Sequence, residues 1–89
     1  MKSSRTARFR KAFDSLPPQI QEQAREAYQR FKQNPYHPGL RFKQVHPSKP
    51  IHSVRVNDDY RAVGIRDGDE IVWFWIGGHD AYDKLVGRL

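Results

Sequence analysis

The sequence contains no cysteine, so no disulfide can hold its fold together. Small secreted domains usually depend on disulfides, whereas proteins of reducing compartments do not. The chain also lacks an apolar run long enough to span a bilayer, and its basic start, Met1–Arg10, lacks the apolar stretch of a secretory signal. We therefore expect a cytoplasmic protein that does not contact a membrane.

Signatures of metal and nucleotide chemistry are absent as well. The four histidines lie in separate segments, with neither helical pairing nor cysteine partners, at His37, His46, His52 and His79. No phosphate-binding glycine loop or nucleophile elbow occurs, and Gly77-Gly78 is too short to cradle a phosphate alone. We expect no metal and no cofactor, so any catalytic site must be assembled from Arg, His, Tyr and acidic side chains.

Basic residues, in contrast, are plentiful. The 16 Lys and Arg exceed the 10 Asp and Glu, which gives a net charge of +6 in 89 residues and an isoelectric point near 10.0. A chain of this length can bury one hydrophobic core, so residues 1–89 are expected to form a single domain. The positive field favours encounter with polyanions, which indicates nucleic acid or an acidic protein as the partner.

The first part of the chain has the periodicity of two amphipathic helices. Between Ser4 and Leu16, apolar residues recur at spacings of three and four. Pro17-Pro18 ends this segment and begins the next, because proline fits the first turn of a helix and forces the preceding residue out of the α region. A second apolar stripe extends from Gln19 to Gln33 and predicts a second helix, antiparallel to the first.

Beyond Gly39 the pattern predicts strands at residues 40–45, 51–56, 60–66 and 70–76. Asn57-Asp58-Asp59 and Asp67-Gly68-Asp69 predict hairpin turns, so the last three strands should form a meander. The final strand is apolar on both faces, which is typical of an interior strand. The expected fold class is α+β, with two N-terminal helices packed on an antiparallel sheet of about four strands. The other sheet face should stay partly open, and residues 79–89 should add a short helix or a loop.

Two arginines are candidates for binding an anion. Arg55 lies near the end of the second expected strand and Arg61 begins the third, so the turn should place them close together on neighbouring strands. A phosphate can accept hydrogen bonds from both in fork geometry. Alternatively, each arginine pairs with a nearby carboxylate such as Asp58. Strand alternation also places Arg61 on the face of Val63 and Ile65, so core positions for those two residues would require a local twist before Arg61 reached the open face.

His79 and Tyr82 follow the last expected strand. If a helical turn begins there, their spacing places the imidazole beside the phenol. Histidine can exchange a proton near neutral pH, and tyrosine can hydrogen-bond a phosphate or stack on a base. The alternative role for His79 is that of a cap or a simple hydrogen-bonding residue. Trp73 and Trp75 are expected in the core rather than as an exposed stacking platform.

The segments Ser53–Ala62 and Trp73–Tyr82 resemble the RelE/ParE superfamily of toxins, and the likeness covers nearly the whole chain. Its specific parts are the basic strand that leads to Tyr60-Arg61 and the strand ending in Gly-His-x-x-Tyr, preceded by two helices and a proline-rich turn. The resemblance implies the toxin of a type II toxin–antitoxin system, acting as a metal-independent, ribosome-associated mRNA endonuclease that inhibits translation. The partners it implies are a cognate acidic antitoxin, mRNA and the ribosome.

In the mechanism that this resemblance implies, the RNA 2′-OH attacks the neighbouring phosphate while an acid and a base serve the two oxygens. The implied catalytic residues are His79, Arg61 and Tyr82, and Tyr82 would align the substrate. Arg55, Arg61 and Lys43 would bind the RNA phosphates. The N-terminal strand usual in the superfamily is reduced here to the polar Lys2–Arg5, hence the expected count of about four strands.

Two other functions remain open, because a fold does not by itself determine a reaction. One is that of a gyrase inhibitor of the ParE type, which is not an enzyme. The other is that of a catalytically silent module that binds RNA or protein.

Overall fold

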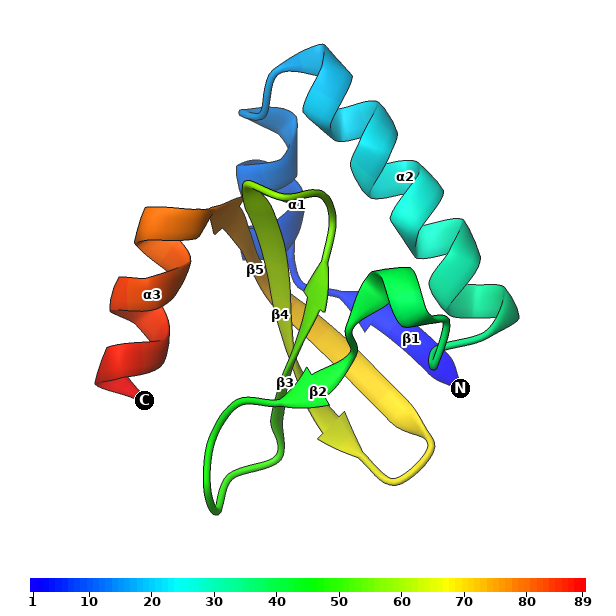
Figure 1. Cartoon of the computed structure of the whole chain (residues 1–89), viewed down its shortest axis with the longest axis vertical. Helices are drawn as coiled ribbons and strands as arrows, with labels where there is room; N and C mark the ends of the chain where they lie inside the picture. The colour runs from blue at the N-terminus through cyan, green and yellow to red at the C-terminus, as the bar shows by residue number, and fades with distance from the viewer.

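The computed structural model describes residues 1–89, which form three α-helices and one five-stranded sheet (Figure 1). In chain order the elements are β1 (Lys2–Arg5), α1 (Ala7–Asp14), α2 (Pro18–Gln33), the short 3₁₀ helix η1 (Pro38–Leu40), β2 (Lys43–Gln44), β3 (Ile51–Arg55), β4 (Tyr60–Asp67), β5 (Glu70–Gly78) and α3 (His79–Arg88). The α+β class, with two N-terminal helices on a mostly antiparallel sheet, is confirmed.

The strands are arranged in the order β1-β5-β4-β3-β2, and only the β1–β5 pair is parallel. The sheet thus has one strand more than expected. The side chains of β1 are polar, which suits a strand at the edge of a sheet. Backbone hydrogen bonds hold β1 in place: the amide of Lys2 donates to the Asp69 carbonyl at 2.8 Å, and the amide of Thr6, just after β1, donates to the Trp73 carbonyl at 3.0 Å. With β1 on one side and β4 on the other, β5 is an interior strand, as predicted.

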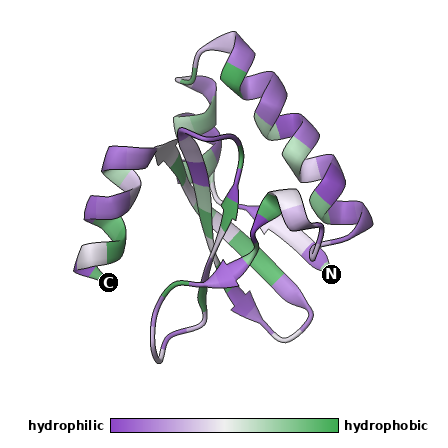
Figure 2. Cartoon of the chain, viewed as in Figure 1, coloured by the Kyte–Doolittle hydropathy of each residue, from purple (hydrophilic) through white to green (hydrophobic).

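Each of the two N-terminal helices begins at a residue that suits the first turn of a helix. The side chain of Thr6 accepts a hydrogen bond from the amide of Phe9 at 3.1 Å and caps α1, which therefore starts three residues after Ser4. Pro18 occupies the first turn of α2, where a missing amide proton costs nothing. In Figure 2 both helices alternate between hydrophilic and hydrophobic residues, as amphipathic helices do. None of the three helices has the length and apolarity that crossing a bilayer requires.

The core lies between these two helices and one face of the sheet. Phe31 of α2 is 2% exposed and meets the rings of Phe42 and Trp73 edge-on, with centroids 5.1 and 5.3 Å away. The other buried members of this cluster are Phe9, Ala24, Ala27, Leu40, Val54, Ala62, Ile71 and Ile76. Helix α3 lies on the opposite side of the sheet (Figure 1), so the face that was expected to be open is partly covered.

A bulge in β5 decides which aromatic side chains face the core. Val63 pairs with Trp75 and Gly64 pairs with Trp73, which leaves Phe74 as the extra residue. Because one extra residue reverses the alternation, Trp73 and Ile76 both face α1 and α2, whereas Trp75 faces the other side. The expectation that both tryptophans are core residues is correct for Trp73, which is buried, and wrong for Trp75, which is half-buried beside α3.

Replacing Gly64 with alanine is expected to destabilise the fold by about 1–3 kcal/mol, the usual cost of overpacking. The added Cβ would lie 2.8 Å from the Val72 carbonyl oxygen and 2.9 Å from Cε3 of Trp73, and a paired backbone oxygen cannot move aside. Gly87→Ala is the matched control, since no atom lies within 4 Å of a Cβ there and alanine favours a helix. Urea midpoints measure both changes; equal midpoints for Gly64→Ala and the wild type would contradict the packing argument.

Candidate functional site

Arg55 and Arg61 are direct partners in the register of β3 and β4. Both lie on the sheet face away from α1 and α2, because their inward-facing neighbours, Val54 and Ala62, belong to the core. Val63 shares the face of Arg61 and is fully buried, but it is not part of the core cluster beneath α1 and α2; its register partners are Ser53 and Trp75. Arg61 therefore reaches this face without any local twist.

The turn between β3 and β4 (residues 56–59) holds both guanidinium groups. The Nη2 atom of Arg55 forms an ion pair with the carboxylate of Asp58. The Nη1 atom of Arg61 donates instead to backbone oxygens of the same region, including the Asn57 carbonyl at 2.6 Å, and no carboxylate forms an ion pair with Arg61. The alternative of carboxylate pairing is thus correct for Arg55 and not for Arg61.

The same turn also anchors His79. The backbone amide of His79, the first residue of α3, donates to the Asp59 carbonyl at 2.6 Å. The imidazole side chain is 54% exposed, with Nδ1 3.5 Å from a carboxylate oxygen of Asp80 and Nε2 3.5 Å from one of Asp83. One four-residue turn therefore gathers both arginines and His79 at one corner of the sheet.

Tyr82 lies over the sheet rather than beside His79. Its hydroxyl donates to Oγ of Ser53 at 3.1 Å, and its ring centroid is 6.3 Å from that of Trp75. The imidazole of His79 faces Asp83, so the expected side-by-side pair of imidazole and phenol does not form. Ser53 is 2% exposed. Its contact with Tyr82 was not predicted, because 29 residues separate the two and no local pattern connects them.

Lys43 stands at the edge of the same face. It pairs with Ser53 in register, and the row continues across the sheet through Val63 to Trp75. Its side chain is exposed and takes part in no ion pair. Lys43 is therefore a free positive charge on the strand next to β3, on the face that also carries the two arginines.

One group of side chains has the donors to hold a divalent cation. A ring nitrogen of His79 and a carboxylate oxygen from each of Asp80 and Asp83 lie within 4.8 Å of one another, and all three residues are exposed. Nitrogen and oxygen donors of this kind suit transition-metal ions. The group contains neither paired histidines nor cysteines, the patterns by which a metal site is recognised in a sequence; exposed acidic side chains also cluster commonly without an ion.

Residues 18–84, well over half of the chain, match the family described as the ParE-like toxin domain. The chain belongs to this family. No curated protein is similar enough to the sequence to match it. The match begins at the first residue of α2 and ends within α3, so it includes Arg55, Arg61, His79 and Tyr82.

Solved structures agree with this ParE-like assignment at the level of the fold. A chain of the RelB–RelE antitoxin–toxin complex from Methanococcus jannaschii has a TM-score of 0.72 and 13% identity, over 91% of this chain and 95% of that one. YafQ from Escherichia coli BL21(DE3) has a TM-score of 0.72 and 12% identity, over 91% and 96%. The YoeB/ParE toxin from Agrobacterium tumefaciens has a TM-score of 0.68 and 14% identity, over 89% and 99%. The ParE-like domain thus shares the fold of RelE-type toxins.

The Arg55–Asp58 pair of the ParE-like domain should make its stability depend on pH. The hydrogen bond from Arg55, followed by the charge of Arg55, holds the pKa of Asp58 below its usual value of 3.8. Because the folded pKa lies below the unfolded one, the stabilisation is complete above the unfolded pKa and is lost as pH falls through the folded pKa. Asp58→Asn should therefore be less stable than the wild type near pH 7 and equally stable at about pH 2.

The urea midpoints of Asp58→Asn and the wild type, measured from pH 7 down to about pH 2, test this prediction. Asp67→Asn is the control, since Asp67 is exposed and forms no ion pair. The difference in urea midpoint between this variant and the wild type should not shrink as the pH falls. A gap between Asp58→Asn and the wild type that stayed constant down to the lowest pH would assign the effect of Asp58 to something other than its charge.

Proposed function

We propose that this ParE-like domain is the cytoplasmic toxin of a type II toxin–antitoxin pair and that it cleaves mRNA on the ribosome without a metal ion. One observation supports the proposal: the β3–β4 turn holds two guanidinium groups and also accepts the backbone hydrogen bond of His79, whose imidazole is exposed. Such a group can bind a phosphate and move a proton beside it.

Arg61 is the better placed of the two arginines to receive a phosphate. Only its Nη1 atom bonds to the protein, so Nε and Nη2 keep hydrogens for a ligand while the backbone contacts hold the side chain in place. Arg55 forms an ion pair with Asp58. It would contact the same phosphate from β3, directly opposite Arg61 on β4. Lys43, on the neighbouring strand, would contact a further phosphate. Preorganised donors of this kind stabilise the charge that develops on phosphate oxygens.

In the proposed reaction the RNA supplies its own nucleophile. The 2′-oxygen loses its proton and bonds to the adjacent phosphorus, the bond from phosphorus to the 5′-oxygen breaks, and the leaving oxygen takes up a proton. The products are a 2′,3′-cyclic phosphate and a 5′-hydroxyl. His79 would serve one of these proton transfers, with Asp80 and Asp83 orienting its ring. Tyr82 would align the substrate from its position over the sheet, next to Ser53.

We infer an acidic antitoxin as the protein partner. The net charge of +6 supports this, because oppositely charged surfaces associate faster and more selectively. Two of the solved structures with this fold are RelB–RelE antitoxin–toxin complexes, from Methanococcus jannaschii and Pyrococcus horikoshii. Binding of such a partner should weaken as salt is raised.

Inhibition of gyrase is the second candidate function. The match to a family described as ParE-like favours it, and so does the Arg55–Asp58 pair, which leaves less positive charge for an RNA phosphate than two free arginines would. A gyrase inhibitor would need no catalytic histidine.

Induced expression followed by mapping of transcript ends tests the proposal directly. An mRNA endonuclease should produce new 5′ ends within coding regions that are being translated, soon after induction. Purified protein should leave gyrase supercoiling unchanged. If supercoiling is inhibited and no new ends arise, the gyrase function replaces the proposed one; if neither effect occurs, the domain is a silent binding module.

A further inference from the structure

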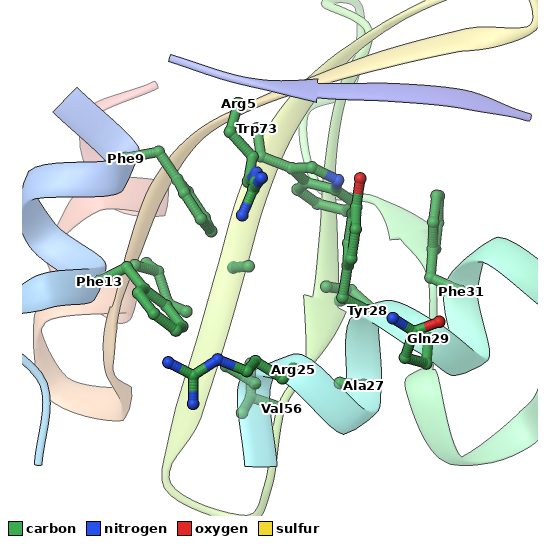
Figure 3. A pocket seen from close by; sticks show the side chains of 14 residues that line it. Arg5, Phe9, Phe13, Arg25, Ala27, Tyr28, Gln29, Phe31, Val56 and Trp73 are labelled. Carbon is green, nitrogen blue, oxygen red and sulfur yellow. The ribbon is translucent and has the colours of Figure 1, made fainter. Parts of the chain in front are cut away.

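Helix α3 is held on the sheet in a different way from the other two helices. Helices α1 and α2 contribute buried side chains to the core, and a cleft of about 310 Å³ lies between them and the sheet. Figure 3 shows Phe9 and Phe13 on one side of this cleft and Tyr28 and Trp73 on another. Helix α3 contributes no buried residue. The apolar side chains along α3 and at its end are only half-buried, at Tyr82, Leu85, Val86 and Leu89. Because an element with so little burial is held weakly, single hydrogen bonds matter for the position of α3.

Three hydrogen bonds connect α3 and the residue after it to the rest of the fold. At the start of the helix, the amide of His79 donates to the β3–β4 turn at 2.6 Å. Within the helix, the hydroxyl of Tyr82 donates to Ser53 at 3.1 Å. At the other end, the ring nitrogen Nε2 of His46 lies 2.8 Å from the carbonyl oxygen of Leu89, 43 residues away in the chain. His46 belongs to the loop between β2 and β3, so that loop holds the C-terminal end of α3.

The hydrogen bonds of the His46 ring show which nitrogen carries the hydrogen. Nδ1 accepts from the amide of Ser48 at 3.1 Å and from the amide of Lys49 at 2.8 Å. Backbone amides can only donate, so Nδ1 carries no proton and Nε2 is the N–H of the ring. A carbonyl oxygen can only accept, so Nε2 donates to Leu89. The same ring therefore closes its own loop through Nδ1 and holds the end of α3 through Nε2.

Other hydrogen bonds keep the loop closed independently of the His46 ring. The side-chain amide of Gln44 donates to the carbonyls of His46 and Lys49, both at 2.9 Å. The amide of Val45 donates to the Ile51 carbonyl at 2.8 Å, at the base of the loop. Carbonyl groups at the C-terminal end of a helix have no partner within the helix, and the imidazole supplies one. A substitution at position 46 can therefore remove the bond to α3 while the loop stays closed.

We propose that His46 is a positioning residue, which keeps Tyr82 over the sheet by holding the C-terminal end of α3. The consequence for catalysis rests on the proposed function; the consequence for the helix rests on the hydrogen bonds alone. Tyr82 lies between two anchors, the β3–β4 turn at the start of α3 and the His46 loop at its end, so loss of the second lets the helix pivot about the first. A displacement of about 1 Å can slow a reaction by about 100-fold. A loosened α3 should therefore slow cleavage although the arginines still bind RNA.

His46→Asn tests the proposal. The side-chain oxygen of asparagine can accept from the nearby amides as Nδ1 does, but the shorter side chain does not reach Leu89. Hydrogen exchange of the α3 amides, followed by NMR on the whole chain, should be about two- to tenfold faster than in the wild type, the factor that one hydrogen bond is worth. Exchange in α2, which buried side chains hold, should not change and shows that the fold is intact. In mRNA cleavage, kcat should fall by at least a similar factor while KM stays the same.

His37→Asn is the matched control, and His46→Gln is the rescue. The Nδ1 atom of His37 also accepts from an amide two residues further on, that of Gly39 at 3.1 Å, but its ring makes no hydrogen bond to α3. His37→Asn should therefore match the wild type in α3 exchange and in kcat. The side-chain nitrogen of glutamine takes the place of Nε2 and can donate to Leu89. His46→Gln should therefore exchange more slowly in α3, and cleave faster, than His46→Asn.

Three results would overturn the role of His46. These are equal α3 exchange in His46→Asn and His37→Asn, no recovery in His46→Gln, and a raised KM with unchanged kcat in His46→Asn, because His46 would then contact the RNA itself. A wild-type protein that does not cleave mRNA would refute the proposed function. In that case the exchange rates of the three variants would still decide whether His46 holds α3.

Discussion

Replacing His79 with alanine is expected to lower mRNA cleavage by about 10²–10⁴-fold, the usual loss when a general acid or base is removed. The fold should survive the change, because the contact of His79 with the β3–β4 turn is made by its backbone amide and the imidazole is more than half exposed. Cleavage of a reporter mRNA by ribosomes supplemented with purified protein measures the effect, and growth after induction measures it in cells.

His37→Ala is the matched control for this experiment. His37 is also exposed and lies in the loop between α2 and η1, where its ring accepts a hydrogen bond from the amide of Gly39. It should retain wild-type cleavage. If His79→Ala cleaved mRNA as fast as His37→Ala, with both proteins folded, His79 would have no part in proton transfer and the reaction would have to depend on the arginines alone.

Replacing Phe31 with alanine is expected to reduce the free energy of unfolding by about 3–5 kcal/mol. Phe31 is 2% exposed and joins α2 to the sheet through edge-on contacts with Phe42 and Trp73. Small domains are stable by only about 5–15 kcal/mol, so this single change removes a large part of the total. It should also widen the adjoining cleft, which Phe31 lines. Urea unfolding monitored by circular dichroism measures the loss.

Tyr36→Ala serves as the comparison for Phe31→Ala. Tyr36 is 63% exposed and its side chain forms one hydrogen bond, accepted from Arg66 at 3.3 Å, so the loss of that side chain should cost within about 1.5 kcal/mol. Similar losses for the two variants would mean that α2 is not held on the sheet by Phe31, and the account of the core would need to change.

Patterns between near neighbours in the chain predicted most elements. The two amphipathic stripes, Pro17-Pro18 and the Asp67-Gly68-Asp69 turn identified the helices and the meander, and their observed limits differ by a few residues at most. The placement of Arg55 and Arg61 on neighbouring strands followed from the turn between them and is confirmed. These features depend on interactions within a few residues, which a sequence displays directly.

Contacts between distant segments were not predictable in the same way. The polar segment Lys2–Arg5 has no strand pattern in its sequence. It forms a strand only because the edge of β5 is free to pair with it. The bulge at Phe74 reverses the faces of β5, and so Trp75 leaves the core although Trp73 remains there. Tyr82 turns toward Ser53 and away from His79 because the sheet lies beneath it.

The sequence by itself determined the fold class, the positive charge and the residue types available for chemistry, since these depend on composition and on short-range periodicity. The tertiary structure decided which of those residues meet. The backbone amide of His79 donates a hydrogen bond to the Asp59 carbonyl in the β3–β4 turn that also holds the two arginines, and the packing of α1 and α2 creates the cleft that Arg5 and Arg25 line. Both depend on segments far apart in the chain, whose pairing is set by burial and backbone hydrogen bonding across the whole molecule.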